Sequence, residues 1–182
     1  MIRIALLLWA ALLLAMPATA QVGVAPPSGF IVAATQGQTS VTGTTAETNL
    51  ASLRIPAGSM GRNGHVEVKS LWSYTNSANN KTLGGRLSAT GGNISGTSLG
   101  GAFATTTATA QILWVIRNNN ATNSQTLWGA QPVTPFGSSA NALLAPAIDT
   151  TQDTFINLTG TLALSTETLT LVHAYAVVFP AN

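Results

Sequence analysis

The stretch that decides the fold class is His65-Val66-Glu67-Val68-Lys69-Ser70-Leu71-Trp72-Ser73-Tyr74. Its even-numbered positions are mostly large and apolar, whereas positions 65, 67 and 69 carry polar side chains. A period of two is typical of a strand that lies with one face on a core. Further short β-prone runs follow, with turn residues between them, and this arrangement predicts an all-β domain rather than alternating strands and helices.

The mature chain is expected to fold as a single antiparallel β-sandwich of about eight strands, jelly-roll-like, over residues 49–182. After residue 20, apolar residues at three-and-four spacing never persist for three helical turns, so no helix is expected. The glycine-dense segment 90–101 is expected to be a flexible loop.

The first twenty residues have the composition of a cleaved signal peptide. Arg3 precedes an apolar run from Ile4 to Ala15, and Ala18-Thr19-Ala20 forms a small-x-small cleavage site. The alternative, a membrane anchor, is disfavoured because a span needs about 20 apolar residues. We therefore expect export, with no stable membrane insertion after cleavage. Residues 21–48 are expected to form an extended or flexible leader, in which 30–48 is either an edge strand or, by preference, a tether.

Charged residues are scarce, and in the mature chain cations and anions nearly cancel. No cluster of lysine and arginine is present, which disfavours nucleic-acid binding and a polybasic membrane surface. The chain has no cysteine, so its stability must rest on packing and strand pairing, with possible burial against other subunits.

The last predicted strand, residues 168–179, changes character at Val172. One face carries alternate large residues from Leu169 to Phe179, and the other changes there from polar to apolar. A strand that is apolar on both faces is either central in its sheet or covered by a neighbouring subunit. The second alternative gives a candidate subunit interface at Val172, Ala174, Ala176 and Val178.

No catalytic, metal or cofactor site is expected. His65 and His173 are isolated in sequence, and isolated strand histidines are more often surface or hydrogen-bonded residues than ligands. Asp149 and Asp153 flank a short loop, but calcium usually requires more carboxylates, so turn formation is the better interpretation.

Aromatic and amide side chains supply the candidate ligand contacts. Trp72 and Trp114 are expected in the core, because they lie in apolar strands. Trp128 lies beside Gly129 and a loop, and is the best candidate for stacking on a sugar ring. Together with the loop residues Asn118, Asn119 and Asn120 it forms the predicted ligand or partner contact.

The region from Leu50 to Phe179 resembles phage and prophage structural proteins of unassigned role. The residues that carry the resemblance are Leu53-Arg54-Ile55-Pro56-Ala57-Gly58-Ser59-Met60-Gly61 with Asn63-Gly64, Leu71 to Leu83, Arg117-Asn118, Asn123-Ser124-Gln125, Asp149-Thr150-Thr151 and Leu169 to Val178. The resemblance implies a β-sandwich virion component, such as a decoration protein or the head of a fibre. It implies no catalytic residues. An export signal fits a bacterial surface or periplasmic protein that uses the same module.

Two hypotheses follow. The first is a non-enzymatic, exported structural module that self-assembles into a homo-oligomer on a virion or cell surface. The second is a secreted carbohydrate-binding or adhesive β-sandwich. A hydrolase ranks below both, because the chain has few acids and isolated histidines.

Overall fold

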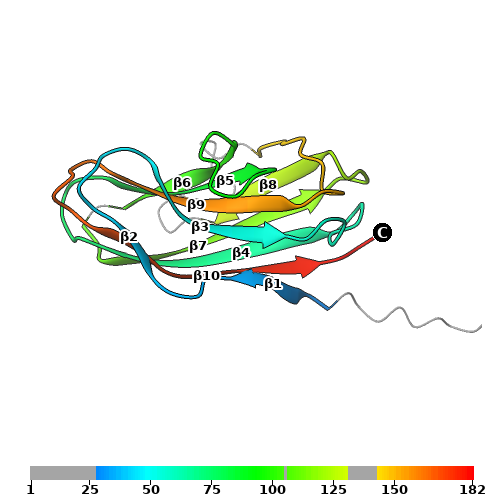
Figure 1. The fold of residues 1–182 in the computed structure, drawn as a ribbon, viewed down its shortest axis with the longest axis horizontal. Coiled ribbons are helices and arrows are strands. Elements are labelled where there is room, and N and C mark those ends of the chain that lie inside the picture. Colours follow the sequence, from blue (N-terminus) through cyan, green and yellow to red (C-terminus); the bar gives the residue numbers. More distant parts are fainter. Residues whose placement is uncertain (1–27, 105, 131–142) are drawn as a thin grey trace, which may run out of the picture.

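The computed structural model describes residues 28–104, 106–130 and 143–182. Within these ranges the secondary structure consists of ten β-strands, arranged as two stacked layers (Figure 1). The described residues contain no helix long and apolar enough to cross a membrane. The signal peptide predicted for residues 1–20 lies outside the described residues, as do residues 21–27 of the predicted leader.

Sheet A has six strands in the order β1-β10-β4-β7-β8, with β2 paired to the same edge of β10 as β1 further along the strand. Sheet B has the order β3-β9-β5-β6. The strands of sheet A are β1 (Phe30–Ala34), β2 (Thr39–Val41), β4 (His65–Tyr74), β7 (Thr109–Asn118), β8 (Gln125–Ala130) and β10 (Leu169–Phe179). Those of sheet B are β3 (Thr48–Ile55), β5 (Lys81–Ser88), β6 (Thr97–Ala104) and β9 (Thr154–Leu162).

This connectivity is that of a jelly roll. The chain passes from one sheet to the other at most connections, so that strands distant in sequence become neighbours in each sheet. If β1 and β2 count as the two halves of one interrupted strand and β8 as an addition at the edge, the remaining order is that of an eight-stranded jelly roll. The predicted fold class is therefore confirmed, with ten strands in place of about eight.

The core lies between the sheets and is filled by alternate residues of nearly every strand. Trp72 and Trp114 are fully buried in it, as their apolar neighbours predict. The indole nitrogen of Trp72 donates to the Ser70 hydroxyl at 2.8 Å, which satisfies a polar group that burial would otherwise leave without a partner.

Two parts of the sequence-based description need correction. The tether favoured for residues 30–48 is wrong for Phe30–Ala34 and Thr39–Val41, because both segments pair with β10 and belong to sheet A. The loop expected at 90–101 ends at residue 96, because β6 begins at Thr97. In β6 the glycines suit a close approach, since a side chain at Gly101 would meet Thr82 Cγ2 at 3.0 Å.

Candidate functional site

A β-bulge in β10 determines which side chains reach the surface of sheet A. Leu171 is the partner of Trp72 and His173 is the partner of Leu71, so Val172 is an extra residue in the pairing with β4. A bulge of this kind reverses the side-chain alternation that follows it. Leu171 therefore points into the core, whereas His173 points outward.

The bulge corrects the subunit interface predicted at Val172, Ala174, Ala176 and Val178. Ala174, Ala176 and Val178 are completely buried in the core between the sheets. Val172 is the half-buried residue at the bulge. Because three of the four side chains face the core of their own subunit, they are not available to contact another.

The side chains of β10 that alternate with these buried residues point outward. Together with the outward side chains of the neighbouring strands in sheet A they form a surface that we name the A face. Cross-strand partners lie on the same face of a sheet, so the pairing of β4 with β10 and β7, and of their neighbours β1 and β8, defines its members. The A face consists of Ile31, Ala34, His65, Glu67, Lys69, Leu71, Gln111, Leu113, Val115, Arg117, Thr126, Trp128, His173, Tyr175, Val177 and Phe179, and it continues beyond the bulge into the polar residues Ser40, Ser73, Thr109 and Thr170.

The outer surface of sheet B provides an internal comparison. The outward positions whose side chains the structure describes are mainly polar, and they include Ser52, Arg54, Thr82, Arg86, Asn157, Thr159 and Thr161. Phe155 is apolar, but the loop after β5 lies against it, since a side chain at Gly91 would meet its ring at 3.2 Å. Asn157 holds this loop in place by donating to the carbonyls of Thr90 and Asn93.

The A face is the more apolar of the two outer surfaces. In a solvated antiparallel sheet the outward residues are usually polar. Here Leu71 is 43 % exposed and Ile31 is 66 % exposed. Leu113, Tyr175 and Val177 are half-buried on the same surface. The interior of the sandwich does not require these side chains, so their presence on the outside calls for another explanation.

Free charges also gather on the A face. Elsewhere in the described chain the acids and bases neutralise one another in three ion pairs: Arg54 with Asp153, Arg86 with Glu47, and Lys81 with Glu167. Arg62 donates to the carbonyl of Asn120, and Asp149 accepts bonds from Thr151. The remaining charged residues, Glu67, Lys69 and Arg117, all belong to the A face, as do both histidines.

A shallow hollow of about 210 Å³ lies within the A face, lined in part by Lys69, Leu71, Gln111, His173 and Tyr175. The imidazole of His173 is held by Thr35, whose hydroxyl lies 3.3 Å from Nδ1. The rings of His173 and Tyr175 are 5.7 Å apart and tilted by 37°. The hollow is smaller than most sites for small molecules, and its size suits a single side chain or one sugar ring.

At the other end of β4, the ring of His65 stacks on Phe179 with centroids 4.6 Å apart. Nε2 of His65 lies 3.9 Å from the carboxylate of Glu67. Burial lowers the pKa of His65, and the nearby positive charge of Arg117 acts in the same direction, while Glu67 opposes both. His65 is therefore largely neutral at pH 7 and acts as a flat aromatic side chain beside Phe179.

The predicted ligand contact divides into structural and surface residues. Asn118 is fully buried, and its amide donates to the Gly61 carbonyl at 2.6 Å and to Thr150 Oγ1 at 2.8 Å. It also accepts a bond from Gln125, so its polar atoms are committed to the fold and it cannot contact a ligand. Asn119 and Asn120 are exposed, and Trp128 lies on the A face opposite Val115.

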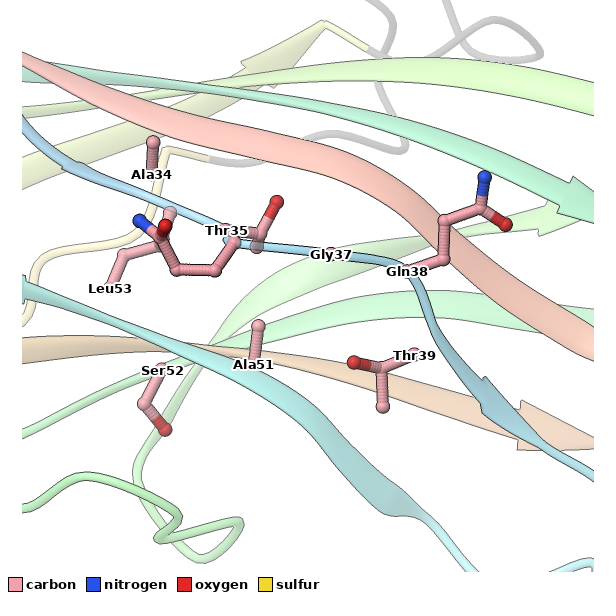
Figure 2. A pocket seen from close by; sticks show the side chains of 9 residues that line it. Ala34, Thr35, Gly37, Gln38, Thr39, Ala51, Ser52 and Leu53 are labelled. Carbon is pink, nitrogen blue, oxygen red and sulfur yellow. The ribbon is translucent and has the colours of Figure 1, made fainter.

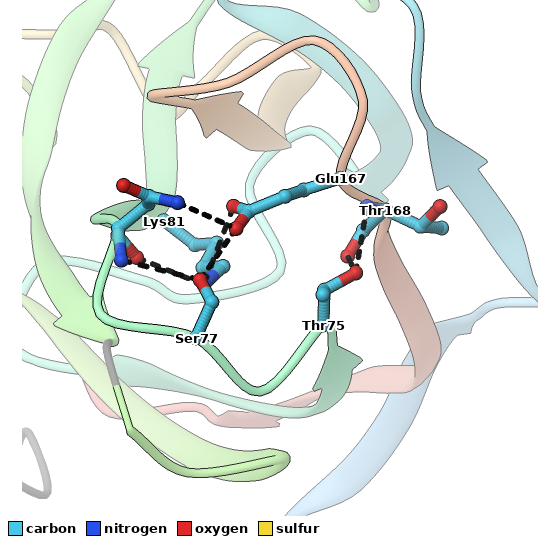
Figure 3. Close-up of polar contacts among 6 residues, drawn as sticks. Thr75, Ser77, Lys81, Glu167 and Thr168 are labelled. Atoms are coloured by element: carbon cyan, nitrogen blue, oxygen red, sulfur yellow. Dashed lines mark hydrogen bonds and ion pairs between the residues drawn. The ribbon is translucent and has the colours of Figure 1, made fainter.

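A polar cluster around the buried Lys81 has a structural role. Lys81 is fully buried, and its Nζ contacts Ser77 Oγ at 2.5 Å, the Asn79 carbonyl at 2.8 Å and Glu167 Oε2 at 3.3 Å (Figure 3). Hydrogen bonds from Asn79 and Ser77 lower the pKa of Glu167, which favours its carboxylate form. The cluster ties the loop after β4 to the turn before β10.

A wider cleft of about 550 Å³ opens at the edge of the sandwich, between the segment that joins β1 to β2 and strand β3 (Figure 2). Its walls are small or uncharged residues, including Thr35, Gln38, Ala51 and Ser52. The cleft offers hydrogen-bonding groups but no acid or base.

Asp149 and Asp153 take part in turns. Asp149 accepts bonds from the backbone and hydroxyl of Thr151, and these bonds lower its pKa. The carboxylate of Asp153 accepts hydrogen bonds from Nε and Nη2 of Arg54 and from the backbone N–H of Ala57. Among the described residues no group of three or more histidine, aspartate and glutamate side chains is placed to hold a metal ion.

Comparison with known proteins identifies no family. No family model matches the chain, and no curated protein matches it. Solved structures with a similar strand arrangement include the winged bean acidic lectin in complex with methyl-α-D-galactose, at 9% identity and a TM-score of 0.37, with 85% of this chain and 99% of the lectin covered.

Another similar structure is that of infectious bursal disease virus, Gt strain, at 15% identity and a TM-score of 0.35, with 85% of this chain and 33% of the viral chain covered. A polysaccharide lyase of family 18 matches at 9% identity and a TM-score of 0.35, with 81% of this chain and 90% of the lyase covered. Likeness at this level supports no inference about function.

Proposed function

We propose that this chain is an exported, non-enzymatic structural module that assembles with copies of itself, and that the A face is the surface covered on assembly. The observation that carries the proposal is the contrast between the two outer surfaces. Sheet B carries the polar exterior of a solvated sheet, whereas sheet A carries outward apolar side chains that only a covering surface would bury.

The distribution of charge supports the same conclusion. Elsewhere in the described chain the acids and bases are held in three ion pairs or, for Arg62 and Asp149, by hydrogen bonds, whereas Glu67, Lys69 and Arg117 are available to a partner outside the subunit. Available charges among apolar residues are typical of a surface that selects its partner by electrostatic complementarity.

The non-enzymatic part of the proposal rests on the use of the acids. Glu47, Asp153 and Glu167 are held by basic side chains, and hydrogen bonds from Arg86, Arg54 and Asn79 respectively keep the pKa of each carboxyl below its ordinary value. These carboxyls stabilise the fold and are poorly suited to act as general acids near neutral pH.

A pair of matched leucine variants tests the proposal. Leu71 on the A face and Leu164 in the turn after β9 are 43 % and 47 % exposed, so an aspartate at either position should be equally tolerated by the fold. Size-exclusion chromatography with light scattering should show an oligomer for the unchanged protein and for Leu164→Asp, and dissociation for Leu71→Asp. A monomer at every concentration for the unchanged protein would refute the proposal.

The hollow beside His173 and Tyr175 favours carbohydrate binding as a second candidate function. Two neighbouring rings with Lys69 and Gln111 at the rim combine a stacking surface with hydrogen-bonding groups for one sugar ring. Affinity electrophoresis in neutral and acidic polysaccharides tests this candidate. It predicts retardation that Tyr175→Ala abolishes and Asn119→Ala leaves intact, and migration unaffected by every polysaccharide would exclude it.

A further inference from the structure

The outward side chains of sheet A lie in rows that cross the strands, and the two central rows have opposite charge. One row runs through Val177, Glu67 and Val115. The next runs through Tyr175, Lys69 and Leu113. Each row therefore has one charge on the central strand β4, with an apolar residue on either side.

Two sheets that pack face to face keep their strands roughly aligned, and two identical copies are related by a two-fold axis. If that axis ran along β4, Glu67 would oppose Glu67 and Lys69 would oppose Lys69. If it ran across the strands, between the two rows, Glu67 of each copy would oppose Lys69 of the other. Like charges pressed together across an interface disfavour the first arrangement.

We propose that two copies pack A face to A face about a two-fold axis perpendicular to β4, with Glu67 of each copy paired with Lys69 of the other. This inference rests on the proposed function, to which it adds the register of the interface and the two residues that determine it.

The flanking rows fit the same register. Beyond Glu67 lies the row of Phe179, His65 and Arg117. Beyond Lys69 lies the row of His173, Leu71 and Gln111. The axis brings these two rows together, so that Arg117 meets a neutral amide and His65 meets the exposed side chain of Leu71.

Shape also favours this register. The stacked rings of His65 and Phe179 lie at one end of the A face. The hollow bounded by Leu71, His173 and Tyr175 lies on the other side of the Glu67 row. The two-fold axis places the stacked pair of each copy over the hollow of the other, which gives the hollow an aromatic side chain as its occupant.

Charge reversal tests the register. In a symmetric dimer, Glu67→Lys opposes lysine to lysine twice and Lys69→Glu opposes glutamate to glutamate twice, so each should weaken the dimer by at least about tenfold in Kd by sedimentation equilibrium. The double variant E67K/K69E restores opposite charges and should return to within about threefold of the unchanged protein. An equimolar mixture of the two single variants should dimerise more tightly than either variant alone.

Thermal melting of each variant serves as the control for folding. If either charge-reversal variant fails to melt cooperatively, the neutral variants Glu67→Gln and Lys69→Gln replace the reversals. Each neutral variant should then raise the Kd of the dimer, and the double neutral variant should raise it no more than either single variant. A double reversal as weak as the single reversals would overturn the register.

The outcomes separate this inference from the function on which it rests. Reversals without effect, combined with dissociation by Leu71→Asp, would keep the A face as the interface and reject the register. If Leu71→Asp also leaves association unchanged, the proposed function fails as well.

Discussion

Leu171 and His173 lie two residues apart on one strand, yet one side chain is buried in the core and the other projects from the A face. In an unbroken strand, residues two apart share a face. The inserted Val172 removes that relation, because Leu171 and His173 pair with the adjacent residues Trp72 and Leu71 of β4. One extra residue therefore decides which of the two alternating sets of side chains in β10 faces outward and is available to a partner.

Deletion of Val172 should remove the bulge and leave the side chains on either side of it on their present faces. Leu171 and His173 already pair with the adjacent residues Trp72 and Leu71, so joining them directly gives an unbroken strand in which Leu171 and Ala174 still face the core. We expect this variant to unfold cooperatively, measured by circular dichroism during heating. Deletion of Ala174 instead forces His173 or Tyr175 into a core packed around an alanine and should abolish cooperative unfolding, and a Val172 deletion as damaging as that one would contradict the assignment.

Asn118 should behave as a structural residue and its neighbour Asn119 as a surface residue. Asn118→Ala leaves buried partners such as Gln125 and the Gly61 carbonyl without their bonds, and should lower the free energy of unfolding by roughly 2–3 kcal/mol. Asn119→Ala should change it by no more than about 0.5 kcal/mol. Urea denaturation of both variants measures the difference, and equal effects would disprove the structural role of Asn118.

Acid should destabilise the domain in two stages. A histidine whose pKa is lowered on folding binds its proton more readily in the unfolded chain, so the contribution of His65 is lost as the pH falls below its ordinary value of 6.5. The pKa values of Glu47 and Glu167 are lowered from 4.5, and those of Asp149 and Asp153 from 3.8, so the stability that these carboxylates contribute is lost as the pH falls below those values. Stability should therefore fall gently below pH 6.5 and steeply below 4.5.

Urea midpoints across this pH range check the profile. Glu167→Gln should lower stability at pH 7, because it leaves the buried amine of Lys81 without its counter-ion, and should make the acid limb shallower. Stability that rises on acidification would contradict the ion-pair assignments.

Much of the fold could be predicted from local patterns. The alternation in residues 65–74 matches β4, and the buried Trp72 and Trp114 follow from their apolar neighbours. The long-range pairing was beyond local patterns. Phe30–Ala34 is weakly patterned because it needs only the edge of β10 to fold upon, and β6 carries glycine at position 101, where a side chain would crowd Thr82 of β5.

The candidate site was harder to predict because a bulge leaves almost no trace in the sequence. The change at Val172 indicates only that both faces of β10 are apolar, and an unbroken alternation through the strand assigns the wrong face to the residues that follow it. The sequence predicts Asn118 as the first residue of an exposed loop, whereas it is the last residue of β7, and its polar side chain closes the core at that end.

The most direct test of the covered A face uses the chemistry of lysine. The sequence has two lysines, and Lys81 is fully buried, so acylation of the side chains at neutral pH reports on Lys69 at the centre of the A face. The labelling rate of Lys69, measured by mass spectrometry against a free lysine peptide in the same sample, should fall with rising protein concentration in step with the dimer fraction from light scattering. A constant labelling rate across concentrations at which dimer forms would show that the A face stays open to solvent.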